Sequence, residues 1–120
     1  ECTMMERRNS SRIRAYRPVR LQPPRTPRFT ETLTKDLSVG GCCCISAEPY
    51  PVTTEMNLEL VLSTGDGPLP LRGKLAWFRM IPHSDQFDLG FSFVDLPPQT
   101  KRRLSAYLDR LCQHVPLVSA

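Results

Sequence analysis

The sequence predicts an all-β fold: six short antiparallel strands closing into a barrel, with a basic N-terminal arm before it and an amphipathic helix after it. Two observations lead to this prediction. Apolar and polar side chains alternate along successive segments, as they do in strands that bury one face. The 120-residue chain also contains 12 prolines, which favour short strands and loops over a bundle of helices.

The arm is expected to cover residues 1–16, and the barrel with its helix residues 17–120. Residues 1–28 hold eight arginines, no lysine and two glutamates, whereas the rest of the chain is slightly acidic. Arginine favours paired hydrogen bonds to phosphate or to base edges; a disordered solubilising tail is the alternative. The sequence begins with Glu1 rather than Met, so it is interpreted as a fragment of a longer protein or a processed chain.

Six strands are expected, at residues 19–21, 29–38, 42–46, 56–63, 69–77 and 87–94. Glycines and prolines separate them, and residues 65–67 (Gly-Asp-Gly) have the chemistry of a tight turn. In the fifth strand, Trp77 falls on the same alternating face as Leu69, Leu71 and Leu75, so it is expected in the core. The buried face of the last strand is expected to hold Phe87, Leu89, Phe91 and Phe93.

A helix is expected near the C-terminus, where the spacing of apolar residues lengthens. The apolar positions follow an i, i+3, i+4, i+7, i+8 pattern and are Leu104, Tyr107, Leu108, Leu111 and Cys112. We expect this stripe to cover an open end of the sheet, with Lys101, Arg102 and Arg103 on the solvated side. Pro97 and Pro98 suit the loop before the helix or its first turn.

The five cysteines are expected to be free thiols. Three of them are consecutive, at residues 42–44, and neighbouring residues of a strand point to opposite faces. No CxxC spacing is present, so a zinc site is not expected. Free thiols indicate a reducing compartment, and the sequence has neither an apolar run of 18 residues nor a signal peptide. The expected location is the cytoplasm, without a membrane span.

Two short motifs contain the candidate binding residues: Arg7-Arg8-Asn9-Ser10-Ser11-Arg12 (RRxxxR) and Asp36-Leu37-Ser38-Val39-Gly40-Gly41 (DxSxxG). An arginine fork can hold a phosphate, contact guanine O6 and N7, or stack on a purine. A carboxylate accepts hydrogen bonds from the N1–H and N2–H edge of guanine, and glycines permit backbone approach. Together the motifs favour a ligand with phosphates and guanines, although each alone also suits an arginine-rich arm or a strand end.

The order of these motifs, followed by Gly73-x-x-x-Trp77, Leu89-Gly-Phe-Ser-Phe93 and a Leu-rich helix, resembles the PilZ domain family over about residues 6–112. The resemblance implies a six-stranded antiparallel barrel with a flanking helix, and binding of the bacterial second messenger cyclic di-GMP. It also implies that phosphate and guanine are gripped by Arg8 and Arg12, and that the guanine pocket is lined by Asp36, Ser38 and Gly41. An arginine directly before the first motif arginine, here Arg7, implies two stacked ligands per domain.

The expected function is that of a receptor without catalytic activity. Cyclic di-GMP is expected to bridge the arm to the barrel edge near Asp36 and so change the arm's contacts with a downstream protein or an attached domain. His83 and His114 have no ligand-spaced partners, and no nucleophile–base set is present. Neither a metal, a cofactor nor an enzymatic activity is therefore expected.

Two alternative functions stay open. A PilZ fold can act as an adaptor between proteins, although the intact motifs argue for ligand binding. A basic arm can also contact nucleic acid. Against that alternative, the phenylalanines of the last strand share its buried face, so no aromatic surface is expected on which bases could stack. Nucleic acid is therefore not the expected partner.

Overall fold

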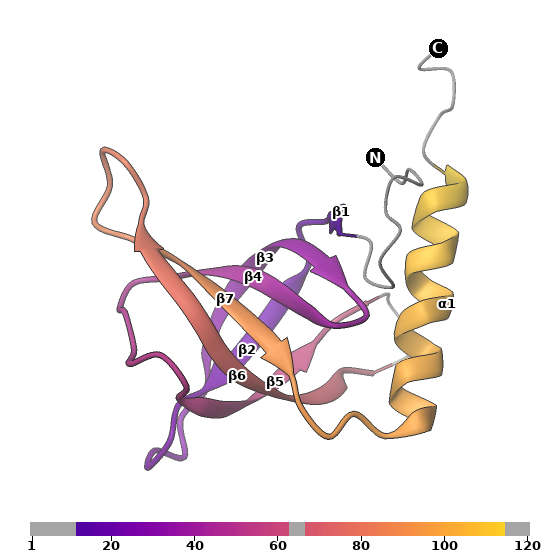
Figure 1. Cartoon of the computed structure of the whole chain (residues 1–120), viewed down its shortest axis with the longest axis horizontal. Coiled ribbons are helices and arrows are strands. Elements are labelled where there is room, and N and C mark those ends of the chain that lie inside the picture. Colours follow the sequence, from indigo (N-terminus) through magenta and orange to yellow (C-terminus); the bar gives the residue numbers. More distant parts are fainter. Residues whose placement is uncertain (1–11, 63–66, 115–120) are drawn as a thin grey trace.

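The computed structural model describes residues 12–62 and 67–114. Over these residues the chain forms seven strands and one helix (Figure 1): β1 (Ile13–Arg14), β2 (Pro18–Gln22), β3 (Thr30–Ser38), β4 (Gly41–Ser46), β5 (Glu55–Leu60), β6 (Leu69–Met80), β7 (Phe87–Phe93) and α1 (Pro98–His114). Six strands close into a barrel in the order β3–β2–β5–β6–β7–β4, and β4 pairs back with β3. Every pairing is antiparallel. The predicted six-stranded barrel is confirmed, with β1 as an additional strand.

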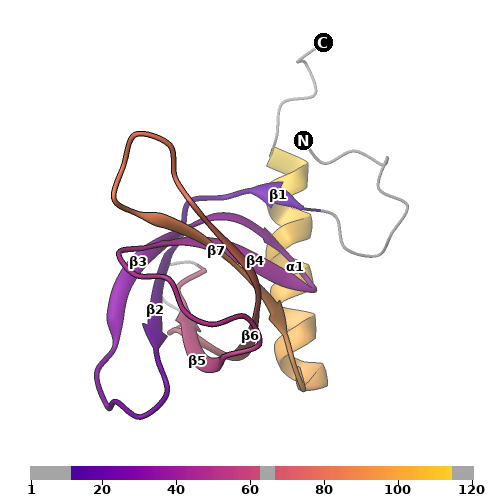
Figure 2. The same cartoon turned by 60° about the vertical axis from the view of Figure 1, so that its left-hand side comes forward.

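Alternating side chains of the strands fill the inside of the barrel, as the period of two predicts. The buried residues of β5 and β6 are Met56, Leu58, Leu60, Leu69, Leu71 and Leu75. The apolar stripe of α1 is also buried, at Leu104, Tyr107 and Leu108, and α1 lies along one side of the barrel (Figure 2). Because side chains occupy the interior, a polar ligand has to bind on the outer surface.

β1 and β2 lie one after the other along the same side of β3. β1 pairs with the C-terminal part of β3 and β2 with its N-terminal part. Thr34 bonds to the segment that connects β1 and β2. Its Oγ1 accepts a hydrogen bond from the Arg17 N–H at 2.9 Å and donates one to the Ala15 carbonyl at 2.6 Å. The N-terminal segment is thereby fixed against β3 from residue 13 onward.

The prediction that Trp77 lies in the core is wrong. Its side chain is 40% exposed, because the pairing of β6 with β7 shifts by one residue between Leu75 and Trp77. The extra residue, Ala76, is a β-bulge that reverses the faces of the residues after it. The indole ring then lies flat on Gly90, where an added Cβ would come within 2.2 Å of it.

The β6–β7 hairpin projects beyond the rest of the barrel. β5 pairs with β6 only as far as Lys74, whereas β7 pairs with it as far as Met80. The projecting part points away from α1 (Figures 1 and 2). The exposed Trp77 therefore stands where β6 leaves the barrel.

Substitution of Gly41, the first residue of β4, tests how closely the backbones of β4 and β7 pack. A Cβ at Gly41 would lie 2.1 Å from the Phe91 carbonyl oxygen, in the backbone of β7. We expect Gly41→Ala to lower the free energy of unfolding by about 3 kcal/mol, measured by urea denaturation. Gly73→Ala is the control, because its nearest neighbours are side-chain atoms of Leu58 and Phe91 at 2.9 and 3.0 Å, which can shift. Equal losses in the two variants would contradict this account.

Candidate functional site

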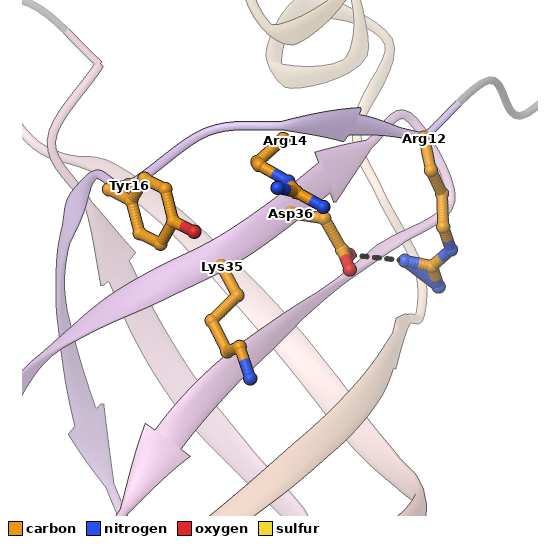
Figure 3. A pocket seen from close by; sticks show the side chains of 5 residues that line it. All are labelled: Arg12, Arg14, Tyr16, Lys35 and Asp36. Atoms are coloured by element: carbon orange, nitrogen blue, oxygen red, sulfur yellow. Dashed lines mark hydrogen bonds and ion pairs between the residues drawn. The ribbon is translucent and has the colours of Figure 1, made fainter. Parts of the chain in front are cut away.

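A polar pocket opens on the outer surface of the barrel, where the N-terminal segment meets β3. Its volume is about 380 Å³, and its lining residues are Arg12, Arg14, Tyr16, Lys35 and Asp36 (Figure 3). The first three come from the N-terminal segment and the last two from β3. The pocket therefore joins the end of the RRxxxR motif to the start of the DxSxxG motif.

A second β-bulge builds the β3 side of this pocket. Thr34 and Asp36 pair with adjacent residues of β4, Cys44 and Cys43, so Lys35 is the extra residue. Thr34 is fully buried, whereas Lys35 and Asp36 are both partly exposed. A regular strand would send these two neighbours to opposite faces. The bulge instead lets both of them line one pocket.

Arg12 and Asp36 form an ion pair across the pocket. Arg12 Nη1 donates to Asp36 Oδ1 at 2.5 Å (Figure 3). The two side chains are 48% and 32% exposed, and ion pairs of such exposure contribute about 1 kcal/mol or less to stability. A ligand that offers Asp36 a better donor can therefore replace Arg12 at little cost.

A buried carboxylate on β7 holds the lysine of the pocket. Asp88 is 2% exposed, its Oδ1 accepts from Lys35 Nζ at 2.9 Å, and its Oδ2 lies 3.3 Å from Arg79 Nη2. The hydrogen bond to Asp88 raises the pKa of Lys35 above its ordinary value of 10.5. Lys35 therefore stays cationic in the neutral range and keeps the pocket positive.

The other residues of the DxSxxG motif build the turn between β3 and β4. Ser38 is 2% exposed, and its Oγ accepts the N–H groups of Gly40 and Gly41, each at 3.1 Å. Gly41 packs against the β7 backbone, and neither glycine takes a positive φ. Of this motif, only Asp36 lines the pocket in the free chain.

Two of the predicted binding residues, Arg7 and Arg8, lie outside the described residues. Three pocket residues were missed by the sequence reasoning: Arg14, Tyr16 and Lys35. A signal for the first two exists, because they alternate with Ile13 and Ala15, which are buried. That alternation is typical of a strand with one solvent-exposed face. Lys35 carries no such signal, because a bulge decides its direction.

The closed antiparallel barrel has a largely cationic pocket on its outer face. The sequence matches the family model of the PilZ domain over residues 6–110. The chain therefore belongs to the PilZ domain family. No curated protein sequence matches it.

Solved structures share this fold. The PilZ domain with c-di-GMP of YcgR from Escherichia coli has a TM-score of 0.70 at 19% identity, covering 90% of this chain and 93% of that one. MotI, an inhibitor of motility from Bacillus subtilis, has a TM-score of 0.75 at 16% identity, and the match covers 91% of this chain and 53% of MotI. MrkH from K. pneumonia, in complex with c-di-GMP, has a TM-score of 0.76 at 18% identity, and the match covers 90% of this chain and 53% of MrkH. The chain spans about half the length of MotI and MrkH, and these identities show the fold alone.

Residues 12–62 and 67–114 contain no group of three or more metal-ligating side chains. Among these residues, no helix is both long and apolar enough to cross a membrane. The pocket at β1 and β3 is the candidate site because it contains a residue of each sequence motif, Arg12 and Asp36.

The cysteines of β4 belong to the barrel wall. Cys42 and Cys44 are buried in the core, where cysteine packs as a small apolar residue, and all three thiols are free. Cys43 stands next to Asp36 across the β3–β4 ladder and is 4% exposed. Burial raises the pKa of Cys43 from 9.0 to about 12. Its thiol is therefore protonated at neutral pH, and it is a poor nucleophile.

This raised pKa predicts a loss of stability at high pH. The protonated Cys43 thiol stabilises the fold fully below pH 9.0, and this contribution disappears as the pH rises toward about 12. In reducing buffer, we expect the wild type to lose up to about 1.4 kcal/mol per pH unit more than Cys43→Ala in that range. Urea denaturation at a series of pH values measures the difference. Parallel pH profiles would show that folding does not change the acidity of this thiol.

Proposed function

We propose that this chain is a receptor domain for cyclic di-GMP. The observation that carries the proposal is the contact between Arg12 and Asp36 in a pocket that also holds Arg14 and Lys35. The family and the c-di-GMP complexes of YcgR and MrkH support the choice of ligand.

The pocket combines several cations with one carboxylate. Arg12, Arg14 and Lys35 attract phosphodiester groups. Asp36 repels phosphate but accepts hydrogen bonds from the N1–H and N2–H groups of guanine. A ligand with phosphates alone gains nothing from Asp36, and a bare purine gains little from the cations. A guanine dinucleotide uses both.

The ion pair of the free chain suggests how binding proceeds. The guanine edge takes the place of Arg12 at Asp36, so the carboxylate stays satisfied throughout. The released guanidinium is then available to hold a phosphate or to stack on the guanine face. Because the original pair is half-exposed, breaking it costs about 1 kcal/mol or less. The exchange therefore favours the ligand.

Ser38, Gly40 and Gly41 contribute to binding through the turn that they build. The turn fixes the end of β3 and with it the backbone that follows Asp36. By their places in the motif, Arg7 and Arg8 add two further guanidinium groups. Arg7 is proposed to hold a second, stacked ligand, which gives two ligands per domain.

The nucleic-acid alternative is stronger than the sequence suggested. Three aromatic residues of the described chain are exposed: Tyr16 by 57%, Trp77 by 40% and Phe78 by 40%. The argument that no stacking surface exists is therefore wrong. The pairing of Asp36 with an arginine still favours guanine recognition over contact with a phosphate backbone. Competition for the site by single-stranded RNA or DNA therefore distinguishes the two functions.

Isothermal titration with cyclic di-GMP tests the receptor proposal. We expect the wild type to bind, and Arg8→Ala and Asp36→Ala each to weaken binding about tenfold to a hundredfold. Arg28→Ala is the matched control, because Arg28 is exposed and does not line the pocket. GTP is the control for a guanine mononucleotide that also carries phosphates. Absence of heat with cyclic di-GMP, or displacement of the ligand by RNA or DNA of arbitrary sequence, would contradict the proposal.

The same titration gives the number of bound ligands. Two cyclic di-GMP molecules per wild-type chain are expected, and one per Arg7→Ala chain, because the stacked partner loses its guanidinium contact. A stoichiometry of one for the wild type at saturating ligand rejects the stacked pair. It leaves the receptor proposal in place.

We also propose that the ligand changes the position of the part of the N-terminal arm that precedes β1, and so its contacts with a downstream protein or an attached domain. Hydrogen exchange tests this step. Cyclic di-GMP is expected to slow amide exchange in residues 6–14, with no comparable change in α1. Unchanged exchange in residues 6–14 at saturating ligand would contradict the movement.

A further inference from the structure

The β6–β7 hairpin has a strand edge without a partner in the described part of the chain. β5 stops pairing with β6 at Lys74, and Leu75 exchanges backbone hydrogen bonds with Thr53 and Thr54. Residues 76–80 of β6, called the free edge below, have β7 as their neighbour on one side alone. Figure 1 shows this part of the hairpin projecting from the barrel.

The ladder with β7 shows which backbone groups of the free edge point outward. Ile81 donates its N–H to the Gln86 carbonyl at 2.9 Å, so these two residues form a hydrogen-bonded pair. Hydrogen-bonded and non-hydrogen-bonded pairs alternate in an antiparallel ladder, so the odd-numbered residues of the free edge bond to β7. The N–H and C=O groups of Phe78 and Met80 therefore point to the open side.

The side chains of the free edge are apolar and exposed. Phe78 is 40% and Met80 59% exposed on one face, and Trp77 is 40% exposed on the other. Lysine or proline protects the open edges of many monomeric proteins from pairing, but the free edge contains neither. Its one charged residue, Arg79, is bonded to Asp88. The free edge therefore offers backbone groups and apolar surface together.

We propose that the free edge is a self-association surface, on which a second copy of this chain adds its own free edge as an antiparallel strand. A twofold axis at Phe78 pairs this residue with the partner's Phe78 through two backbone hydrogen bonds. Arg79 then lies opposite the partner's Trp77. The chain already makes a pair of this kind internally, with the Arg79 guanidinium 5.9 Å from the centre of its own Trp77 ring.

Sequence and charge favour a second copy as the occupant. A contact about a twofold axis needs a surface that complements itself. The free edge complements itself when the axis passes through Phe78. An axis at Arg79 is disfavoured, because it would place two arginines directly opposite each other. The charged residues of the hairpin between positions 75 and 90 are Arg79, Asp85 and Asp88. Two hairpins therefore meet with little net repulsion.

The proposed contact is small, since it uses one short strand edge from each copy. Interfaces of this size are transient, so the expected dissociation constant is roughly 100 µM. The contact involves β6, whereas the ligand pocket lies at β1 and β3. It is therefore independent of the proposed receptor function, and the ligand-free chain is sufficient to test it.

Sedimentation velocity of the ligand-free chain, from low micromolar to millimolar concentration, tests the proposal. We expect a reversible monomer–dimer equilibrium that Phe78→Lys and Met80→Lys abolish. Leu33→Lys is the matched control: Leu33 is 43% exposed on β3, a strand paired on both sides. Met80→Pro provides a second test, because it removes an outward N–H while leaving the bonds to β7. Hydrogen exchange adds an internal control: the Phe78 amide should slow with concentration, whereas that of Trp77 should not.

Each contrary result overturns a defined part of the proposal. A monomer at all concentrations rejects self-association. A dimer that survives both lysine substitutions on β6, or that Leu33→Lys abolishes equally, places the contact on another surface. A dimer lost in the lysine variants but kept in Met80→Pro, with unchanged exchange at Phe78, rejects strand pairing. Circular dichroism of each variant confirms that the barrel is intact.

Discussion

The pairing of β1 with β3 brings Arg12 next to Asp36, 24 residues further along the chain, and the candidate site depends on this contact. Thr34 secures it by bonding to the backbone on both sides of the gap between β1 and β2. Without this pairing, the arginines would belong to a separate arm and the carboxylate to a strand end. The pairing of β1 with β3 thus brings residues of both motifs into one pocket.

Regular periodicity explains what the sequence could predict and what it could not. The barrel follows from alternation in β5, β6 and β7, and the helix from the spacing of Leu104, Tyr107 and Leu108. Arg14 and Tyr16 were missed although they alternate with buried residues, whereas the directions of Trp77 and Lys35 depend on bulges. Ala76 turns Trp77 outward, and Lys35 joins Asp36 on the outer face, because one extra residue reverses every following side chain. Nothing in the alternation of residue types marks either position.

Three charged residues of the outer face form a connected set that spans four neighbouring strands. Lys35 on β3 and Arg79 on β6 both bond to Asp88 on β7, with β4 lying between β3 and β7. A buried carboxylate needs such partners, because an unpaired one would be costly. Asp88 thus fixes the lysine of the pocket and the arginine of the free edge through one side chain. Sequence alone placed Asp88 on a polar strand face, with no sign that it would be buried.

The interior of the barrel is closed by apolar side chains, and the pocket and the free edge both lie outside it. Substitutions at either place therefore leave the packing that stabilises the fold largely untouched. Such a domain can change its ligand or its partner during evolution while the core stays constant. Low sequence identity at high structural similarity, as with YcgR, MotI and MrkH, is what this separation of core from surface allows.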